Sequence, residues 1–230
     1  MARKHVVAAL SLVLCLLYPS VAFSQSRTPL EVVIPGSSMT TRIVFVVDVS
    51  GSMGSPRGSQ GDHRTGLDWA LASMKSITEA VGDEAHCMFY AFGGGVAVYK
   101  TEWTELPDQA EMLSVIAWYR SVASMGDMQA GTELMPALQI AMCHPEIDTS
   151  LVIITDSELD DDEEVIARID KINAARPSGR MPIAIVCVDE DILGDTTSRK
   201  ITKEVSGYYL RPTLLPCPPP AEAPKEENVR

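Results

Sequence analysis

The stretch IVFVVDVSGS, residues 43–52, decides the fold. Its first half, residues 43–47, is an unbroken run of β-branched and aromatic side chains, which is typical of a central strand buried on both faces. Its second half is polar, with Asp48, Ser50 and Ser52 at alternate positions. Together the two halves predict a parallel sheet in which oxygen-bearing side chains follow the carboxyl end of a central strand.

Segments with strand and helix patterns alternate after this stretch. Short apolar runs predict strands at 87–92, 151–154 and 183–188, and residues 96–99, after three glycines, are expected to form a hairpin edge strand. Apolar residues three and four apart predict helices at 67–81, 108–122, 133–143, 160–174 and 196–206. The predicted fold is therefore α/β: a three-layer, doubly wound sandwich with a mostly parallel central sheet, one antiparallel edge strand and helices on both faces.

The chain divides into four predicted segments. Residues 1–24 have the order of a secretory signal peptide: a basic start, an apolar run, and the small residues Ala22 and Ser24 before a cleavage point. The alternative is an uncleaved anchor, but the apolar run of 13 residues is short against the roughly 20 that span a bilayer. We therefore expect a secreted or periplasmic protein with no stable membrane span after cleavage. A lead-in, the α/β domain and a Pro-rich acidic tail follow, at residues 25–40, 41–210 and 211–230.

The charge of the chain limits its partners. Formal net charge is −12 over 230 residues, and removal of residues 1–24, with two positive and no negative side chains, leaves −14. Such a surface repels nucleic acid, so we expect no nucleic-acid partner.

The cysteines and histidines suggest no metal site of their own, because no two cysteines have the spacing of zinc ligands. Cys87 and Cys187 lie within apolar runs and are expected to be buried. If a disulfide forms, we expect it between Cys143 and Cys217. We expect His63 and His144, in or near loops, at the surface.

Three polar groups fall at the predicted carboxyl edge of the sheet. Asp48, Ser50 and Ser52 follow the first strand, Thr132 opens a helix, and Asp156 follows the strand at 151–154. All five side chains offer carboxylate or hydroxyl oxygen, which hard cations prefer. They therefore predict a Mg²⁺ site, and Mn²⁺ or Ca²⁺ would fit the same donors.

The same five residues resemble the metal-ion-dependent adhesion site of von Willebrand factor type A domains, and the resemblance covers roughly residues 40–208. The matching pattern is Asp-x-Ser-x-Ser after a first strand, a later Thr, and a Thr-Asp after a later strand. It implies that Ser50 and Ser52 ligate the metal directly, and that Thr132 does so in the ligand-competent state. Asp48 and Asp156 would act directly or through water. An open coordination position would take a Glu or Asp from a protein partner, without catalysis.

Residues next to this site are candidates for a partner-binding rim: Met53, Gly131, Ser157 and Glu158. Ser157 stands where the family commonly has Gly. The loop at 54–64 lies beside the site and is either a determinant of partner choice or a tolerated insertion. Acids crowd residues 158–164, and we interpret them as a solvated helix start facing the helix dipole, in preference to a second cation site or a surface selecting basic partners.

Three classes of function compete on this basis. The first is an exported, non-catalytic module that binds a protein through the metal, and the second is an assembly subunit with an incidental metal. The third is a phosphatase similar to haloacid dehalogenases, which also place an Asp after the first strand. That chemistry needs a general acid two residues later, where this chain has Ser50. We therefore expect no enzymatic activity.

Overall fold

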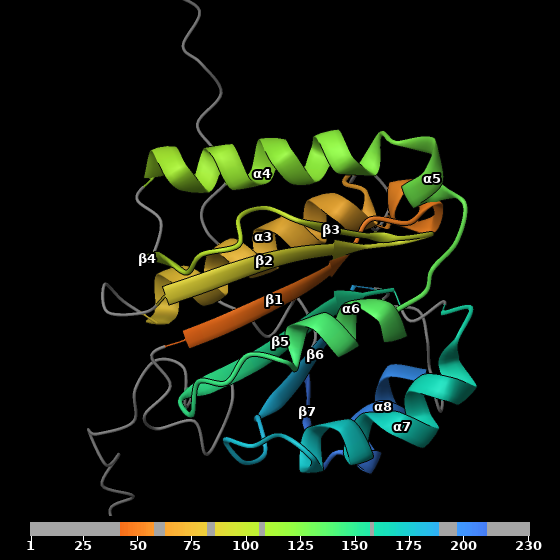
Figure 1. The fold of residues 1–230 in the computed structure, drawn as a ribbon. Helices are drawn as coiled ribbons and strands as arrows, with labels where there is room; N and C mark the ends of the chain where they lie inside the picture. The colour runs from red at the N-terminus through yellow and green to blue at the C-terminus, as the bar shows by residue number, and fades with distance from the viewer. Residues whose placement is uncertain are drawn as a thin grey trace, which may run out of the picture.

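The computed structural model describes residues 42–57, 63–81, 86–105, 109–156, 159–188 and 197–210. Within them a seven-stranded sheet lies between two layers of helices (Figure 1). The strands have the spatial order β3-β2-β1-β5-β6-β7, and β4 pairs with β2 beside this path. Their bounds are β1 Arg42–Asp48, β2 His86–Phe92, β3 Val96–Val98, β4 Thr104–Glu105, β5 Thr149–Thr155, β6 Ile183–Cys187 and β7 Tyr208–Leu210.

The helices follow the predicted pattern with small shifts at their ends. They are η1 Gly51–Gly54, α3 Gly66–Val81, α4 Gln109–Ala123, α5 Gly126–Gln129, α6 Met135–Ala141, α7 Asp162–Ala174 and α8 Thr197–Glu204. Four observed elements are not predicted from the sequence: β4, β7, α5 and η1. Each spans four residues or fewer, too few to show a hydrophobic period.

The strand directions confirm the predicted α/β class. β1 runs parallel to β2 and to β5, and β5, β6 and β7 continue the parallel order. β3 pairs antiparallel with β2 at one end of the sheet, and the two-residue β4 also pairs antiparallel with β2. The sheet is therefore mostly parallel, and its carboxyl ends meet at one edge.

The apolar run of β1 is explained by its central place in the sheet. Ile43 and Phe45 face one core, to which α3 and α4 also contribute, whereas Val44 and Val46 face a second core shared with α6, α7 and α8. The helices accordingly cover the two faces of the sheet in two groups (Figure 1). Because both faces of β1 are covered, every position from Ile43 to Asp48 is buried.

Several expectations fall on residues outside this description. The predicted signal peptide, lead-in and Pro-rich tail lie there, so they stay predictions. Within the described ranges, no helix is both long and apolar enough to cross a membrane. Cys87 and Cys187 are buried, as predicted, and Cys143 is exposed. The pairing of Cys143 with Cys217 stays a prediction, because Cys217 is outside the described residues.

The two histidines differ in their surroundings. His63 is exposed, as expected. The surface expectation is wrong for His144, which is half-buried and lies 2.7 Å through Nε2 from the Tyr90 hydroxyl. Burial lowers the pKa of His144, and Arg176 lowers it further, while Glu146 acts in the opposite direction.

Candidate metal centre

The carboxyl ends of β1 and β5 bring the first predicted ligands together. Val47 is in register with Ile154, so Asp48 and Thr155 follow at the same level of the sheet. The Thr155 hydroxyl donates to Asp48 Oδ2 at 2.7 Å, and the backbone N–H of Ser50 donates to Asp48 Oδ1 at 2.9 Å. Two neighbouring strands thus orient the Asp48 carboxylate.

The two serines lie together beyond Asp48. The hydroxyl oxygens of Ser50 and Ser52 are 3.1 Å apart, at the turn where β1 leads into η1. Ser50 is only 3% exposed and Ser52 is partly buried. The alternate spacing read from the sequence therefore places both hydroxyls on one side of the loop.

Burial of two carboxylates dominates the electrostatics of the centre. Asp48 and Asp156 are both 0% exposed. Burial raises the pKa of Asp48 to about 7, and the charge of Asp156 also raises it, while the hydrogen bonds from Ser50 and Thr155 lower it. The protein therefore holds an acid that is costly to ionise beside a second acid, and such arrangements concentrate at functional sites.

Arg57 contacts this centre, and the sequence reasoning did not identify it. Its Nη2 lies 2.9 Å from Asp156 Oδ2 and 3.4 Å from the backbone oxygen of Ser52. The Arg57 side chain is 16% exposed and that of Asp156 is 0% exposed. A basic residue in the loop after a predicted metal-binding turn was the available signal, but sequence alone does not show that the Arg57 side chain reaches Asp156.

The loop that carries Arg57 is fastened at both ends. The Arg57 N–H donates to the Arg64 carbonyl at 2.9 Å, and Pro56 and Thr65 form an antiparallel bridge. The Arg64 guanidinium in turn lies over the Trp69 ring, 3.7 Å from its centroid. Arg57 is thus placed by backbone pairing as well as by its side-chain contacts.

Thr132 lies on a separate loop that is bound to the start of α7, and its hydrogen bonds are with Asp160 rather than with the other four predicted ligands. Its N–H donates to Asp160 Oδ2 at 2.7 Å, and the Asp160 N–H donates to the Thr132 carbonyl at 3.0 Å. The Asp161 carboxylate accepts from the N–H groups of Leu134 and Met135, at 3.1 and 2.6 Å. Thr132 is 8% exposed.

These bonds correct part of the interpretation of residues 158–164. Asp160 and Asp161 are not merely solvated acids at the start of their own helix, because they bind backbone amides of another segment. The side chain of Asp161 makes no capping bond to α7 and instead caps α6. The two acids hold the Thr132 loop against the residues that follow Asp156.

Glycines at the end of β2 let the Thr132 loop pack closely. A Cβ atom on Gly93 would lie 2.1 Å from the Met128 carbonyl oxygen, and one on Gly94 would lie 2.2 Å from that of Asp127. The Glu133 N–H also donates to the Gly93 carbonyl at 2.9 Å. The segment before Thr132 therefore rests directly on backbone at the sheet edge.

The structure contradicts one residue of the predicted partner-binding rim and leaves the other three untested. Met53 is 1% exposed and packs in the core beside α3, so its prediction as a rim residue is wrong. Its apolar side chain points inward because η1 turns it away from solvent. Gly131 is half-buried on the Thr132 loop. Ser157 and Glu158 lie outside the described residues.

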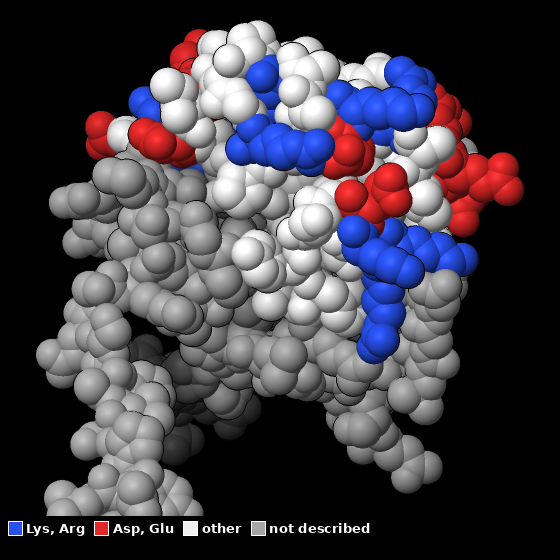
Figure 2. All heavy atoms as spheres, turned by 90° about the horizontal axis from the view of Figure 1, so that it is seen from below, with Lys and Arg blue, Asp and Glu red and all other residues white. Residues whose placement is uncertain are grey.

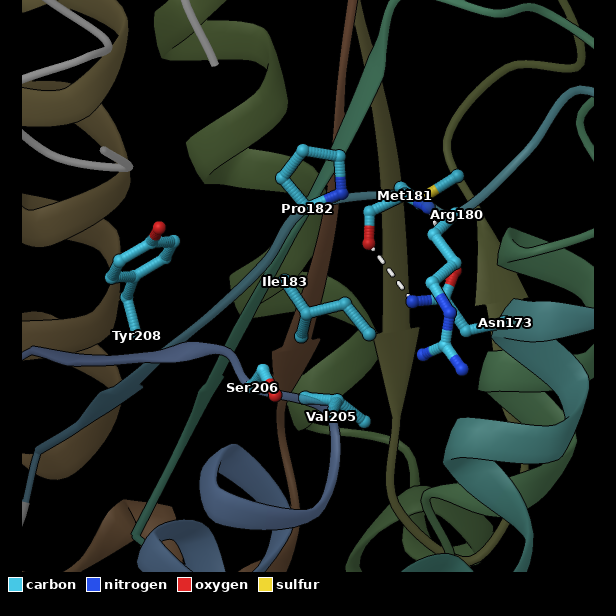
Figure 3. Close-up of a pocket in the computed structure, with 8 residues that line it drawn as sticks. All are labelled: Asn173, Arg180, Met181, Pro182, Ile183, Val205, Ser206 and Tyr208. Carbon is cyan, nitrogen blue, oxygen red and sulfur yellow. Dashed lines mark hydrogen bonds between the residues drawn. The ribbon is translucent and has the colours of Figure 1, made fainter. Parts of the chain in front are cut away.

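A cavity of about 240 Å³ elsewhere offers no comparable chemistry (Figure 3). It lies beside Ile183 and Tyr208, the first residues of β6 and β7, and thus at the opposite end of the strands. The Asn173 amide in its wall is satisfied by the backbone of Met181, with bonds of 2.9 and 2.8 Å. Arg180, also in the wall, is paired with Asp170.

Among the described residues, the face seen in Figure 2 shows no concentration of one charge. On the face that α7 and α8 cover, basic and acidic side chains are interspersed (Figure 2). Among the described residues, no group of three or more His, Cys, Asp or Glu side chains could hold a metal. The predicted centre is not of that kind, because it combines two carboxylates with three hydroxyls.

Comparisons with known proteins support the fold. No protein-family model and no curated protein matches the sequence. Among solved structures, an aerotolerance-related membrane protein from Bacteroides fragilis matches with a TM-score of 0.53 and 15% identity, covering 74% of this chain and 90% of that protein. A von Willebrand factor type A protein from Catenulispora acidiphila matches with a TM-score of 0.51 and 20% identity, covering 76% of this chain and 39% of that one.

A third similar structure is the manganese-loaded TRAP protein of Plasmodium vivax. Its TM-score is 0.52 at 11% identity, and the match covers 75% of this chain and 68% of that protein. At these identities the likeness concerns the fold, which is that of von Willebrand factor type A domains, as the sequence resemblance implied.

Proposed function

We propose that this protein is a non-catalytic adhesion or assembly module that binds a hard divalent cation, Mg²⁺ in the first instance, and through it an acidic side chain of a protein partner. The cation would be held by Asp48, Ser50, Ser52, Thr132 and Asp156. The observation that carries the proposal is the convergence of oxygen donors at the ends of β1 and β5, where two fully buried carboxylates adjoin two hydroxyls 3.1 Å apart.

The donor set fits such a cation. Carboxylate and hydroxyl oxygens are the ligands of Mg²⁺ and Mn²⁺, and no softer ligand competes within the set. Two buried acids disfavour each other's charge, which contributes to the raised pKa of Asp48. A divalent cation would remove that repulsion and would supply a Lewis-acidic position for an incoming carboxylate.

The charge balance supports an acidic partner. Asp48 and Asp156 together would neutralise a divalent cation, and the guanidinium of Arg57 adds one further positive charge within 2.9 Å of Asp156. A loaded centre would therefore be positive on a protein whose net charge is −12. Local positive charge in an acidic surface favours a partner that presents a carboxylate at this point.

The phosphatase alternative gains no support from the geometry. The residue two positions after Asp48 is Ser50, whose side chain contacts Ser52 and whose N–H orients Asp48. A Ser hydroxyl at that position cannot serve as the general acid of that chemistry. The assembly-subunit alternative shares the fold and differs in whether the partner needs the metal.

Isothermal titration calorimetry with MgCl2 and MnCl2 tests the cation site. Manganese is included because the TRAP structure carries it. We expect Asp48→Ala and Asp156→Ala to weaken binding at least tenfold, which corresponds to about 1.4 kcal/mol. Asp127→Ala is the matched control, since it removes an exposed acid from the neighbouring α5. Equal affinities in all four proteins would refute the site.

A pull-down from the native host tests the use of the site. We expect a partner to be recovered by the wild-type chain with Mg²⁺ present and lost with chelator or with Asp156→Ala. Recovery that is unchanged by chelator would instead favour an assembly subunit with an incidental metal.

A further inference from the structure

The Arg57 guanidinium forms an ion pair with Asp156, one of the two buried acids of the centre. Its Nη2 is 2.9 Å from Asp156 Oδ2, and the backbone N–H of Arg57 donates to the Arg64 carbonyl, so backbone pairing also fixes the residue that carries the guanidinium. The Asp156 side chain has no exposed surface. This is a positive charge supplied by the chain to a carboxylate that the proposed function assigns to a metal.

Two properties of arginine make this contact consequential. The guanidinium carries its positive charge on a planar group with several N–H donors, which suits contact with a carboxylate. Its attraction to a buried carboxylate is only weakly screened by salt, because the pair is largely removed from water. Any cation that approaches Asp156 therefore meets a fixed positive charge already bound to that acid.

We propose that Arg57 is an internal competitor of the metal, which balances the charge of Asp156 in the metal-free protein and thereby lowers the affinity of the centre for divalent cations. The inference rests on the proposed function and adds a residue that sets how much metal is needed for loading. The guanidinium would balance Asp156 in the metal-free protein and the metal would balance it in the loaded protein. The displaced Arg57 charge would remain beside the centre and keep the loaded centre positive.

The charges of the centre with and without Arg57 are consistent with competition between the guanidinium and the metal. Without metal, the guanidinium already offsets the charge of Asp156, so the site should attract a cation less strongly than it would without Arg57. Removal of the guanidinium would take this positive charge away from the buried Asp156, which lies close to the equally buried Asp48. Such a pair binds a divalent cation more strongly and is less stable without one.

The test compares Arg57→Gln and Arg57→Lys with the wild-type chain by calorimetry with MnCl2. Arg64→Gln is the matched control, because it removes the same charge from the paired residue of the same loop, where the guanidinium stacks on Trp69. We expect Arg57→Gln to bind Mn²⁺ at least tenfold more tightly and Arg57→Lys to fall between it and the wild type. Arg64→Gln should change affinity by less than threefold.

A stability measurement in chelator provides the second readout. Urea unfolding should show Arg57→Gln less stable than the wild type in EDTA, and this difference should shrink or reverse in saturating MnCl2. Arg57→Lys keeps a positive charge, so it gives a folded variant for the titration if Arg57→Gln unfolds.

The outcomes separate this inference from the proposed function. If the wild type binds Mn²⁺ and both Arg57 variants bind it equally or more weakly, the competition is refuted while the metal site stands. If neither the wild type nor any Arg57 variant binds Mn²⁺, both are refuted. Tighter binding by Arg57→Gln and by Arg64→Gln alike would refute a specific role for Arg57 and indicate a general effect of net charge.

Discussion

Replacing Gly93 by Ala should displace the loop that carries Thr132. The added Cβ would lie 2.1 Å from the Met128 carbonyl oxygen, and that oxygen belongs to the backbone, so no side-chain rotation can relieve the overlap. Backbone on one side must retreat by about 1 Å to restore an ordinary contact. Gly93 is buried, which leaves little room for the retreat.

The magnitude follows from the bonds that this movement disturbs. Gly94 N–H to Met128 O, at 3.1 Å, and Glu133 N–H to Gly93 O, at 2.9 Å, both cross the same contact. Each bond contributes about 1 kcal/mol net, and overpacking a filled site costs about 1–3 kcal/mol more. We therefore expect Gly93→Ala to lower the free energy of unfolding by about 3 kcal/mol.

Urea unfolding in EDTA, followed by MnCl2 titration, measures both consequences. Gly95→Ala is the matched control, because its Cβ would meet only the Met128 sulfur at an ordinary 3.7 Å. We expect the control to stay within about 0.5 kcal/mol of the wild type, as a substitution without a clash should. Gly93→Ala should also bind Mn²⁺ more weakly, because Thr132 moves with its loop. Equal stability of the two variants would show that the loop is not held by this contact.

Two further predictions concern Asp161 and His144. Asp161→Ala should destabilise the protein by about 2 kcal/mol, because two backbone N–H groups at the start of α6 lose a charged acceptor. Glu163→Ala, the control in the first turn of α7, should have little effect. Similar urea midpoints for the two variants would contradict this prediction. His144 has a lowered pKa in the folded protein, so the unfolded chain binds its proton more readily and stability falls as pH drops below about 6.5. His144→Gln should reduce the dependence of the free energy of unfolding on pH in this range. An unchanged pH dependence would show that other groups cause it.

The fold was predictable to the extent that its elements are long and periodic. The buried run of β1 and the spacing of apolar residues in α3 carry their own signal, because burial on two faces or on one stripe demands those patterns. β7 has only three residues, and its place beside β6 depends on pairing rather than on local preference. Short elements of this kind are decided by their neighbours.

The candidate site also contains residues that the local sequence predicts correctly and one that it does not. Asp48, Ser50 and Ser52 could be identified from one short stretch, because a strand followed by a turn places alternate side chains at one edge of the sheet. Met53 looked like a continuation of that stretch, but η1 turns its side chain into the core. One turn of helix is enough to reverse the direction of a side chain.

Residues 43–52 were by themselves enough to predict the class of the fold and the oxygen-bearing side chains at one edge of its sheet. This is because the pattern of a buried strand and of the turn that follows it extends over only a few residues. Only the tertiary structure decided that Arg57 reaches Asp156, 99 positions away in sequence, and that Asp160 and Asp161 fasten the Thr132 loop. These contacts, an ion pair and hydrogen bonds from backbone N–H groups to carboxylates, join segments that are distant along the chain. Their existence depends on how the crossovers fold, and no local pattern encodes that.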